Sequence, residues 1–455
     1  MTKNLTTGDP LRLILSFALP LFAGNLFQQA YNMADAAIVG LYLGPSSFAA
    51  VGASGSVQFF ILGFCMGLCV GFSIPVSQRF GADDLGRMRC FIFTGTVTLV
   101  VFSLALAATC VILCTRILQL MKTPPDIFAE AWDYLCTIFA GMPFLIFYNF
   151  FSGNLRAAGD SKSPFCFLLV SITLNIILDL AFIIVFHWGV RGAALATVIS
   201  QAVSGALCLV YILARVRVLV PQKEERHWRV SDCGTLLSMG IPMGLQFSIT
   251  AIGSMVLQAA NNSLGSLYVS AFSAAGKIKQ LMMSPFDAIG AAVSTFAAQN
   301  FGAAKPDRIR RGIAQGLLAA MAYGVVACLV LIFLGQTLCL MFVSPDEVDI
   351  LEAAGLYSRV SGFFFWLIAI LNVVRPTVQS LGFTKRTIFS GVVEMFARCF
   401  VTFVFVPRFA FLAVCFADPA AWLCAVLYMS FTLLWCLRKI ERDMSGTHTL
   451  HSTGS

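Results

Sequence analysis

Charged residues are scarce in this 455-residue sequence: Asp, Glu, Lys and Arg together account for 11%, whereas hydrophobic residues account for 58%. The mean hydropathy is +0.85. A water-soluble protein cannot bury that share of apolar side chains, so a lipid bilayer must be the solvent for most of the chain. The scarcity of charge therefore predicts an integral membrane protein.

Histidine is rarer still, with four residues, and the sequence has no Cys-x-x-Cys pair. Cys65 and Cys69 are one helical turn apart, as are Cys110 and Cys114, but no histidine accompanies either pair. The 15 cysteines are scattered through apolar stretches, where cysteine behaves as a small hydrophobic residue. We therefore expect no metal centre, no redox site and no organic cofactor. The sequence also shows no arrangement of a nucleophile and a base, which argues against a membrane-embedded enzyme.

Sizeable polar segments are missing apart from residues 215–232, RVRVLVPQKEERHWRVSD. An apolar stretch of about 20 residues can span a bilayer as a helix. Twelve such stretches are present, at residues 13–38, 48–78, 90–113, 130–154, 164–186, 190–213, 235–260, 267–300, 312–336, 351–378, 387–407 and 411–437. Six precede the polar segment and six follow it.

The two halves of the chain are copies of one unit. Residues 73–89 (SIPVSQRFGADDLGRMR) and 294–310 (STFAAQNFGAAKPDRIR) match at seven of 17 positions, at an offset of 221. RAAGDSK at 156–162 and QSLGFTK at 379–385 repeat at an offset of 223. Six spans return a chain to its starting side, so both copies have the same orientation, and internal duplication of this kind is typical of transporters.

The predicted fold class is therefore an all-α integral membrane protein with 12 transmembrane helices. They form two six-helix bundles related by a pseudo-two-fold axis along the membrane normal. The expected domains are an N-terminal lobe (1–214), a cytoplasmic linker (215–232), a C-terminal lobe (233–440) and a disordered cytoplasmic tail (441–455).

The distribution of basic residues predicts the orientation. Of 30 Lys and Arg residues, 21 fall on the side that holds both termini and the linker, and four fall on the other side. The positive-inside rule places both termini in the cytoplasm. Because topology accounts for the net charge of +8, nucleic acid is not an expected partner.

A polar stripe runs along the first predicted helix. Asn25, Gln28, Asn32 and Asp35 recur at steps of three and four, which places them on one helix face. A carboxylate at bilayer depth costs at least ~2.5–3.5 kcal/mol, so this face must line an interior cavity and not contact lipid.

A second short polar face lies in the fifth and sixth spans, where Asn175 and Asp179 are four residues apart and Thr197 adds a hydroxyl. Interhelical hydrogen bonding is the alternative role for these side chains. We predict that Asp35, Asn175, Asp179 and Thr197 form a cation-coupling site. Two carboxylates in a poorly hydrated pocket cannot easily both ionise, so one could carry a proton. The same oxygens could instead coordinate Na⁺.

The seventh predicted helix repeats the stripe, but Val256 or Leu257 stands where the first helix has Asp35, so the ion site belongs to the N-terminal half. Polar and charged residues in the spans of both halves are candidates for lining a substrate cavity. They are Gln28, Asn32, Gln246, Thr250, Gln258, Lys277, Asp287 and Glu394. For Glu394 the alternative is an ion pair with Arg398, one turn away, and Lys277 could simply reach towards the membrane surface.

Several segments together resemble the multidrug and toxic compound extrusion (MATE) transporters of bacteria, over nearly the whole chain. They are LFQQAYNMADAAIVG (26–40), SQRFGA (77–82), LRAAGDSKSP (155–164), LNIILDLAFI (174–183), WGVRGAALATVISQ (188–201), AQNFGA (298–303) and ADPAAW (417–422). The resemblance implies two six-helix bundles with a cavity that opens alternately to either side. It also implies that Asp35 couples cation movement to export, with Asn175, Asp179 and Thr197 beside it.

The expected function is that of a secondary antiporter, not of an enzyme. It would export organic, often cationic, amphipathic compounds in exchange for inward H⁺ or Na⁺, as a functional monomer in the bacterial plasma (inner) membrane. A flippase of a lipid-linked precursor is the alternative on the same superfamily fold, because Lys277, Lys279, Arg375 and Arg398 could bind a pyrophosphate. The expected partners are therefore a small-molecule substrate and the lipid bilayer.

Overall fold

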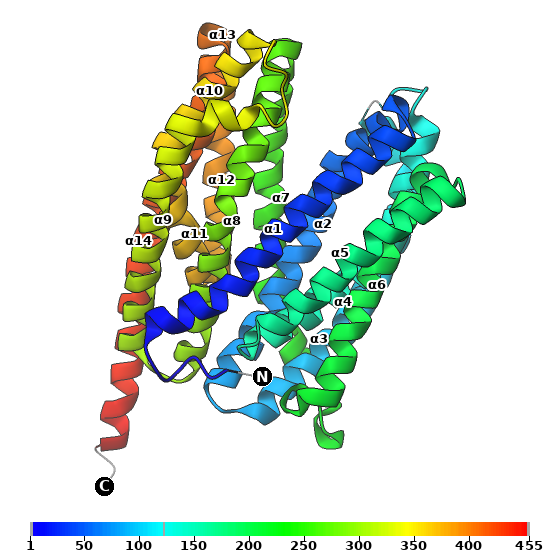
Figure 1. Cartoon of the computed structure of the whole chain (residues 1–455). Helices are drawn as coiled ribbons and strands as arrows, with labels where there is room; N and C mark the ends of the chain where they lie inside the picture. The colour runs from blue at the N-terminus through cyan, green and yellow to red at the C-terminus, as the bar shows by residue number, and fades with distance from the viewer. Residues whose placement is uncertain (1–2, 122, 453–455) are drawn as a thin grey trace. The chain divides into compact units, whose positions relative to one another are not determined.

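The computed structural model describes residues 3–121 and 123–452, and within them the chain forms helices and turns without a β-strand (Figure 1). The helices of the first half are α1 (Pro10–Tyr42), α2 (Pro45–Gly81), α3 (Leu85–Leu120), α4 (Phe128–Ala157), α5 (Lys162–Leu180), η1 (Ala181–Val185) and α6 (Gly189–Arg215). Two 3₁₀ turns, η2 (Arg217–Leu219) and η3 (Lys223–Glu225), lie in the linker. The second half contains α7 (Val230–Asn262), α8 (Ser266–Gly302), α9 (Pro306–Cys339), α10 (Val348–Phe363), α11 (Phe365–Ser380), α12 (Thr384–Phe400), η4 (Val401–Phe405), α13 (Val406–Phe409) and α14 (Phe411–Ser452).

The predicted all-α membrane fold is confirmed. Within the described residues, eleven helical segments are each long and apolar enough to cross a membrane, and α10 and α11 pass the same test together as a pair bent by 53°. This bent pair occupies the stretch 351–378, for which the sequence predicted one span. The break follows Gly362, where a Cβ atom would lie 2.7 Å from the Leu331 side chain of α9.

The duplication seen in the sequence recurs in the helix boundaries. α2 begins at Pro45 and α8 at Ser266, 221 residues later, and both helices have 37 residues. The π-helices η1 and η4 begin 220 residues apart. The RAAGDSK and QSLGFTK repeats each contain a glycine with positive φ, Gly159 at 83° and Gly382 at 92°. Glycine adopts this left-handed conformation without a steric penalty, so the repeat preserves a turn.

The chain forms two compact units. Unit 1 comprises Ala23–Gly244 with the described residues of Met1–Asn4, and unit 2 comprises Leu5–Phe22 with the described residues of Leu245–Ser455. Two helices therefore pass from one unit to the other: α1 begins in unit 2, and α7 begins in unit 1. Their crossing points follow residues 22 and 244, 222 residues apart, so the exchange of helix halves obeys the same repeat.

A proline lies two residues before each crossing point, Pro20 in α1 and Pro242 in α7. Proline has no backbone N–H and its ring crowds the preceding turn, so an intrahelical hydrogen bond is lost there. Each crossing helix is therefore weakened at the place where it changes unit.

Glycines allow α7 to pack closely on α2 inside unit 1. A Cβ atom at Gly67 would lie 2.8 Å from Gly244, and a Cβ at Gly71 would lie 2.4 Å from the Cα of Gly240. The two helices thus meet through a Gly-x-x-x-Gly pair on each side. In lipid, where the hydrophobic effect does not drive helices together, such close packing is a main source of association.

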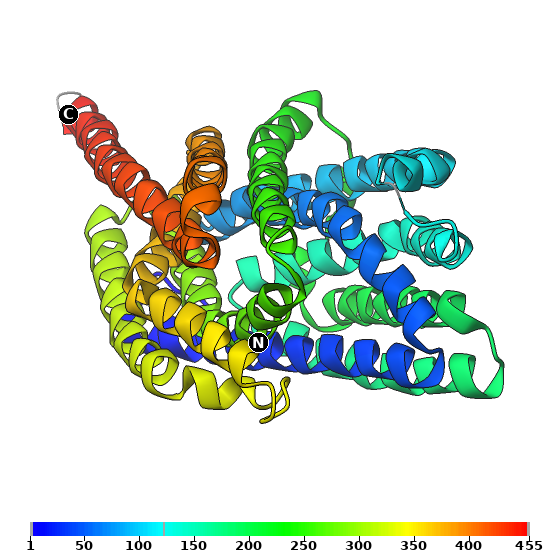
Figure 2. The ribbon, with the colours of Figure 1, turned by 90° about the horizontal axis from the view of Figure 1, so that it is seen from above.

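Within unit 1, α4 packs against α2, α3 and α6 (Figure 1). Within unit 2, α8 packs against α9 and α11, and α12 packs against α14. The core of unit 2 is one large apolar cluster that includes Phe286, Phe296 and Phe365. The C-terminal helix α14, drawn in red, extends past the other helices of its unit (Figure 1 and Figure 2).

α14 continues to Ser452, through most of the segment 441–455 for which the sequence predicts disorder, and residues 453–455 lie outside the described residues. An ion pair between Arg310 and Glu441 joins the start of this extension to α9. The linker contains short helical turns and its Leu219 side chain is buried in the core of unit 1.

Candidate functional site

The four residues predicted to form the cation-coupling site lie together in unit 1. Asp35 is on α1, Asn175 and Asp179 are on α5, and Thr197 is on α6. The Nδ2 atom of Asn175 donates to Thr197 Oγ1 at 3.4 Å, and Thr197 Oγ1 in turn donates to the carbonyl of Ala193 at 3.2 Å. Asp179 is 0% exposed and Asn175 is 2% exposed.

The Asp35 and Asp179 carboxyl groups lie close enough to interact with each other electrostatically. Two neighbouring carboxylates repel each other, so a proton or a cation bound between them lowers their electrostatic energy. Several buried oxygens around this contact receive no hydrogen bond: one of Asp35, one of Asn175 and both of Asp179. Buried oxygens are almost always satisfied, so a cluster of acceptors without donors is suited to a cation or a proton.

Three further side chains complete the cluster, and the sequence analysis did not identify them. The hydroxyl of Tyr31 lies 3.4 Å from Thr197 Oγ1. Tyr134 of α4 lies within electrostatic range of both carboxyl groups, and Gln58 of α2 lies beside its hydroxyl group. Tyr31 precedes Asp35 by four residues, so the polar stripe of the first helix could have been extended to include it. Tyr134 and Gln58 have no periodic signal of this kind.

Local helix geometry explains why these side chains meet. A Cβ atom at Gly141 of α4 would lie 2.1 Å from Val198, so the missing side chain lets α6 approach α4 beside Thr197. On α5, the π-helix η1 begins two residues after Asp179. A π-turn widens the helix locally and is frequent at functional sites.

Two small apolar clusters lie on the helices that carry the site. Tyr134 packs with Ile138, Val190 and Ala194, and a second small apolar cluster contains Val39 and Ile183. Asp179 is buried beside these clusters, whereas Asp35 is half-buried. Electrostatic interactions are stronger in such surroundings than in water.

The candidates for the substrate cavity fall into two groups. Some are exposed or half-buried, and others are buried in contacts between helices. Gln28 donates to Asn32 Oδ1 at 3.3 Å on the α1 segment of unit 1, where Asn32 is exposed. Gln258 donates to Asn262 Oδ1 at 2.8 Å on α7. Lys277 is exposed, with its ammonium group 5.0 Å from the ring centre of Phe342.

Gln246 is buried between α7, α11 and α12. Its Nε2 atom donates to Thr250 Oγ1 at 3.3 Å, and its Oε1 atom accepts from Gln379 at 3.4 Å. A Cβ atom at Gly391 of α12 would lie 3.1 Å from the Gln246 carbonyl. Gln246 therefore contributes to helix packing in this structure, although the sequence pattern suggested a cavity.

Glu394 is likewise buried, in a network of charges in unit 2. It forms an ion pair with Arg375 of α11, and its other oxygen lies 3.7 Å from Arg398. The predicted Glu394–Arg398 pair is thus present, but Arg398 has a closer partner in Asp418 of α14, at 2.9 Å. Asp418 also binds Lys279 of α8 at 2.5 Å.

Tyr357 of α10 joins this network by accepting from Lys279 at 2.5 Å and donating to Asp418 at 3.3 Å. Five helices are therefore connected through buried charges. The role of Asp418 was missed, although the residue belongs to the ADPAAW motif, because no residue within a turn of it could pair with it.

Asp287 differs from the other acidic residues in the spans of unit 2. Its side chain is exposed, although it lies near the middle of α8. Asn372 of α11 donates to its Oδ1 atom at 2.8 Å. The contact depends on Gly290, where a Cβ atom would lie 1.9 Å from the Asn372 carbonyl. An exposed carboxylate at this depth requires a water-filled surrounding, since lipid would penalise it.

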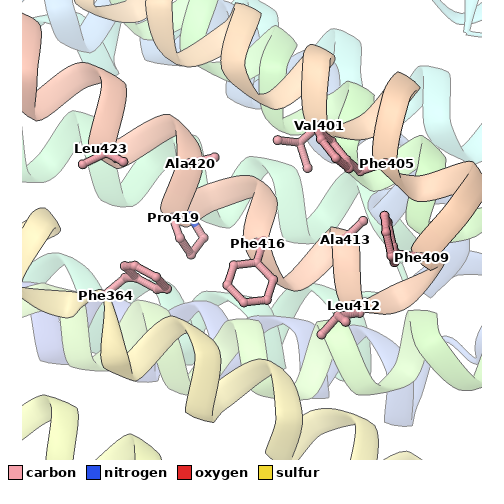
Figure 3. Close-up of a pocket in the computed structure, with 10 residues that line it drawn as sticks. All are labelled: Phe364, Val401, Phe405, Phe409, Leu412, Ala413, Phe416, Pro419, Ala420 and Leu423. Atoms are coloured by element: carbon pink, nitrogen blue, oxygen red, sulfur yellow. The ribbon is translucent and has the colours of Figure 1, made fainter.

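An apolar pocket of about 390 Å³ lies in unit 2 (Figure 3). Phe364, Val401, Phe405, Phe409, Leu412, Ala413, Phe416, Pro419, Ala420 and Leu423 line it. None of the predicted site residues is among them, and these described lining residues include no charged group. It suits hydrocarbon and offers no basis for recognising a cation.

The acceptor cluster of unit 1 fits a monovalent cation better than a structural metal. Among the described residues, no three His, Cys, Asp or Glu side chains are arranged to hold a metal ion. Two carboxyl groups with an amide oxygen and a hydroxyl can bind either H⁺ or Na⁺.

Comparison with known proteins identifies the family of the chain. The model of the MatE family matches residues 20–181 and 242–404, one stretch in each half. The probable multidrug resistance protein YpnP of Bacillus subtilis (strain 168) is 30% identical over 83% of this chain and 84% of its own length. An FAD transporter of Shewanella oneidensis is 22% identical over 74% of this chain and 75% of its own.

A crystal structure of MATE in complex with MaL6 superposes with a TM-score of 0.89, at 21% identity, over 98% of this chain and all of the other. This likeness shows that the fold is shared. Because the family match covers both halves, the chain belongs to the MatE family of multi-pass membrane transporters.

Proposed function

We propose that this protein is a secondary antiporter that exports organic, often cationic, amphipathic compounds in exchange for inward H⁺ or Na⁺, by alternating access. The observation that carries the proposal is the contact between Asp35 and Asp179 among buried oxygens that lack donors. The electrostatic energy of such a site changes when a cation binds to it or leaves it. It can drive a cycle if the cation binds one conformation more tightly than the other.

The direction of transport and the substrate class are supported by relatives. YpnP is named a probable multidrug resistance protein. The exposed carboxylate of Asp287 can neutralise a cationic compound within unit 2. One cation entering along a potential of 100 mV delivers ~2.3 kcal/mol, which is enough to concentrate a neutral substrate about fifty-fold.

Transport of anionic compounds has weaker support, although one relative is named an FAD transporter. The cations Lys279, Arg375 and Arg398 all contact Glu394 or Asp418, so their charges are already compensated. A flippase of a lipid-linked precursor would need free cationic groups for its pyrophosphate. The buried network leaves little charge for that purpose.

We place the protein in the bacterial plasma membrane as a functional monomer, with both termini in the cytoplasm. The excess of Lys and Arg on the side of the termini and the linker supports this orientation.

The test is transport of ethidium into inverted membrane vesicles, whose lumen corresponds to the outside of the cell, under an imposed H⁺ or Na⁺ gradient. Wild-type protein should export dye under one of the two gradients, and Asp35→Asn should reduce export to background while the protein remains folded. Asparagine keeps the shape of the side chain and removes an expensive buried charge. Asp179→Asn should also impair export, and the double variant should be little worse than the more damaging single variant, because the two carboxyl groups form one site. Export by Asp35→Asn at the wild-type rate would show that coupling resides elsewhere.

A further inference from the structure

The repeated motif at residues 73–89 and 294–310 takes no part in the ion site, although it is the clearest repeat in the sequence. In the second copy it forms the corner between α8, which ends at Gly302, and α9, which begins at Pro306. Side chains of this corner contact the backbone of residues 5–8, which leads into α1. Both partners belong to unit 2.

Two fully buried side chains at the end of α8 hold Leu5. The backbone N–H of Leu5 donates to Gln299 Oε1 at 2.9 Å, and its carbonyl accepts from Asn300 Nδ2 at 3.2 Å. The Leu5 side chain is 1% exposed and belongs to the core of unit 2. The segment is therefore fixed by both its backbone and its side chain.

Arg308 adds a second layer of contacts. Its Nη2 atom donates to the Leu5 carbonyl at 3.2 Å, Nη1 donates to the Gly8 carbonyl at 2.8 Å, and Nε donates to Asn300 Oδ1 at 3.0 Å. Lys305 donates to the neighbouring carbonyl of Thr6 at 3.0 Å. Only a planar guanidinium group can reach three acceptors in this way, so lysine cannot replace Arg308.

The first copy of the motif holds the corresponding segment of the other half. Arg87, the counterpart of Arg308, binds Asp232 in the first turn of α7 at 2.8 Å. Arg89 binds Glu225 of the linker at 2.8 Å. Asp232 is 0% exposed, so its charge depends on this partner. All four residues belong to unit 1.

Each copy thus binds the chain just before, or at the start of, a helix that passes from one unit to the other. The N-terminal segment itself changes unit between Asn4 and Leu5. In unit 1 the carbonyl of Lys3 lies against Gly159, where a Cβ atom would be only 2.0 Å away. The segment that leads into α1 is therefore held on both sides of the point where the chain passes from unit 1 to unit 2.

We propose that the two copies of the motif are clamps for the crossing helices, and that the clamp of Gln299, Asn300 and Arg308 positions α1 for transport. This second part rests on the proposed function. Asp35 lies near the end of α1 in unit 1, whereas the start of the same helix is held in unit 2. A movement of α1 that follows ion binding at Asp35 acts on unit 2 only if the start of the helix is fixed.

The test compares Arg308→Gln with Arg311→Gln, a matched change one turn further along α9 at an exposed arginine. Hydrogen exchange of the full-length protein should be faster for the peptide that contains Leu5 in Arg308→Gln, by about tenfold, because charge-assisted hydrogen bonds are lost. Gradient-driven ethidium export should fall by about tenfold, whereas the Kd of ethidium should change by less than about twofold. Arg311→Gln should match wild type in all three measurements.

Unchanged hydrogen exchange in Arg308→Gln would overturn the clamp. Faster exchange with unchanged export would overturn the positioning role. An equal loss of export and binding would also overturn it, because general destabilisation would explain both losses. If Arg308→Gln does not fold, Lys305→Gln removes only the contact with Thr6 and should give smaller changes in the same direction. If wild-type protein exports no dye under either gradient, the proposed function fails, while the exchange measurement still decides whether the clamp exists.

Discussion

At the scale of single residues, burial separates acidic groups that can act on a ligand from those that hold helices together. Glu394 and Asp418 are both buried and both bind cationic side chains. Asp35 and Asp179 face each other and have oxygens without donors. Asp287 is exposed. Three chemical situations therefore occur among the acidic residues of the spans.

The exposed position of Asp287 leads to a prediction about selectivity. Asp287→Asn should reduce export and binding of ethidium by about tenfold or more, since loss of a charge-assisted contact is worth about 1.5–3 kcal/mol. Export of an uncharged substrate should persist, because the ion site in unit 1 is intact. Parallel transport assays with a cationic and an uncharged dye measure how much more export of the cationic dye is lost. Equal losses for both dyes would contradict a role in recognising charge.

At the scale of helices, the charge network in unit 2 connects α8, α10, α11, α12 and α14. Asp418 accepts from Lys279, Tyr357 and Arg398, so it is the acceptor on which three helices depend. Removing one partner from a buried set of charges is more harmful than removing a surface pair, because the remaining charges lose their compensation.

Asp418→Asn should therefore destabilise the protein by about 3–5 kcal/mol. Thermal unfolding of the detergent-solubilised protein is the measurement. Asp346→Asn, at an exposed aspartate in the loop before α10, is the matched control and should shift stability by less than about 0.5 kcal/mol. Similar melting of the two variants would mean that the network adds nothing to stability.

The glycine contact between α2 and α7 supports a second prediction at this scale. Gly71→Ala places a Cβ atom 2.4 Å from the Cα of Gly240, and backbone cannot yield as a side chain can, so we expect a loss of about 1–3 kcal/mol. Gly52→Ala, on the same helix, has open space and should be neutral or stabilising by up to about 1 kcal/mol. Melting of the two variants side by side decides whether close packing, and not helix propensity, explains the glycines of α2.

At the scale of the whole molecule, duplication and exchange of helix halves give each unit a composite origin. The exchange follows the repeat offset, and the clamps at Arg87 and Arg308 obey the same repeat. The sequence repeat therefore preserves the connections of the crossing helices as well as the helices themselves.

The predicted orientation can be tested on intact cells. An epitope inserted in the loop at residues 344–346, between α9 and α10, should be accessible to antibody from outside. The same epitope in the linker near Gln222 should be accessible only after permeabilisation, because the positive-inside rule places the linker in the cytoplasm. The reverse pattern would show that the basic residues do not determine the topology of this chain.

Some properties of this protein could be derived from its sequence because they depend on composition and period. The apolar stretches predicted the spans, the offset of 221 predicted the duplication, and the spacing of Asn175 and Asp179 predicted a shared helix face. All of these depend on residues that are near in the sequence, or on segments that are compared at one fixed separation along the sequence.

Other properties depend on which helices approach each other, and only the tertiary structure decided them. Asp35 meets Asp179 across α1 and α5, whereas Gln246 and Glu394 are buried in helix contacts despite their place in polar patterns. Arg398 binds Asp418 of another helix more closely than its own neighbour Glu394. The sequence specifies which face of a helix is polar, but the partner of that face depends on close approaches at glycines such as Gly141 and Gly290, which no local pattern reveals.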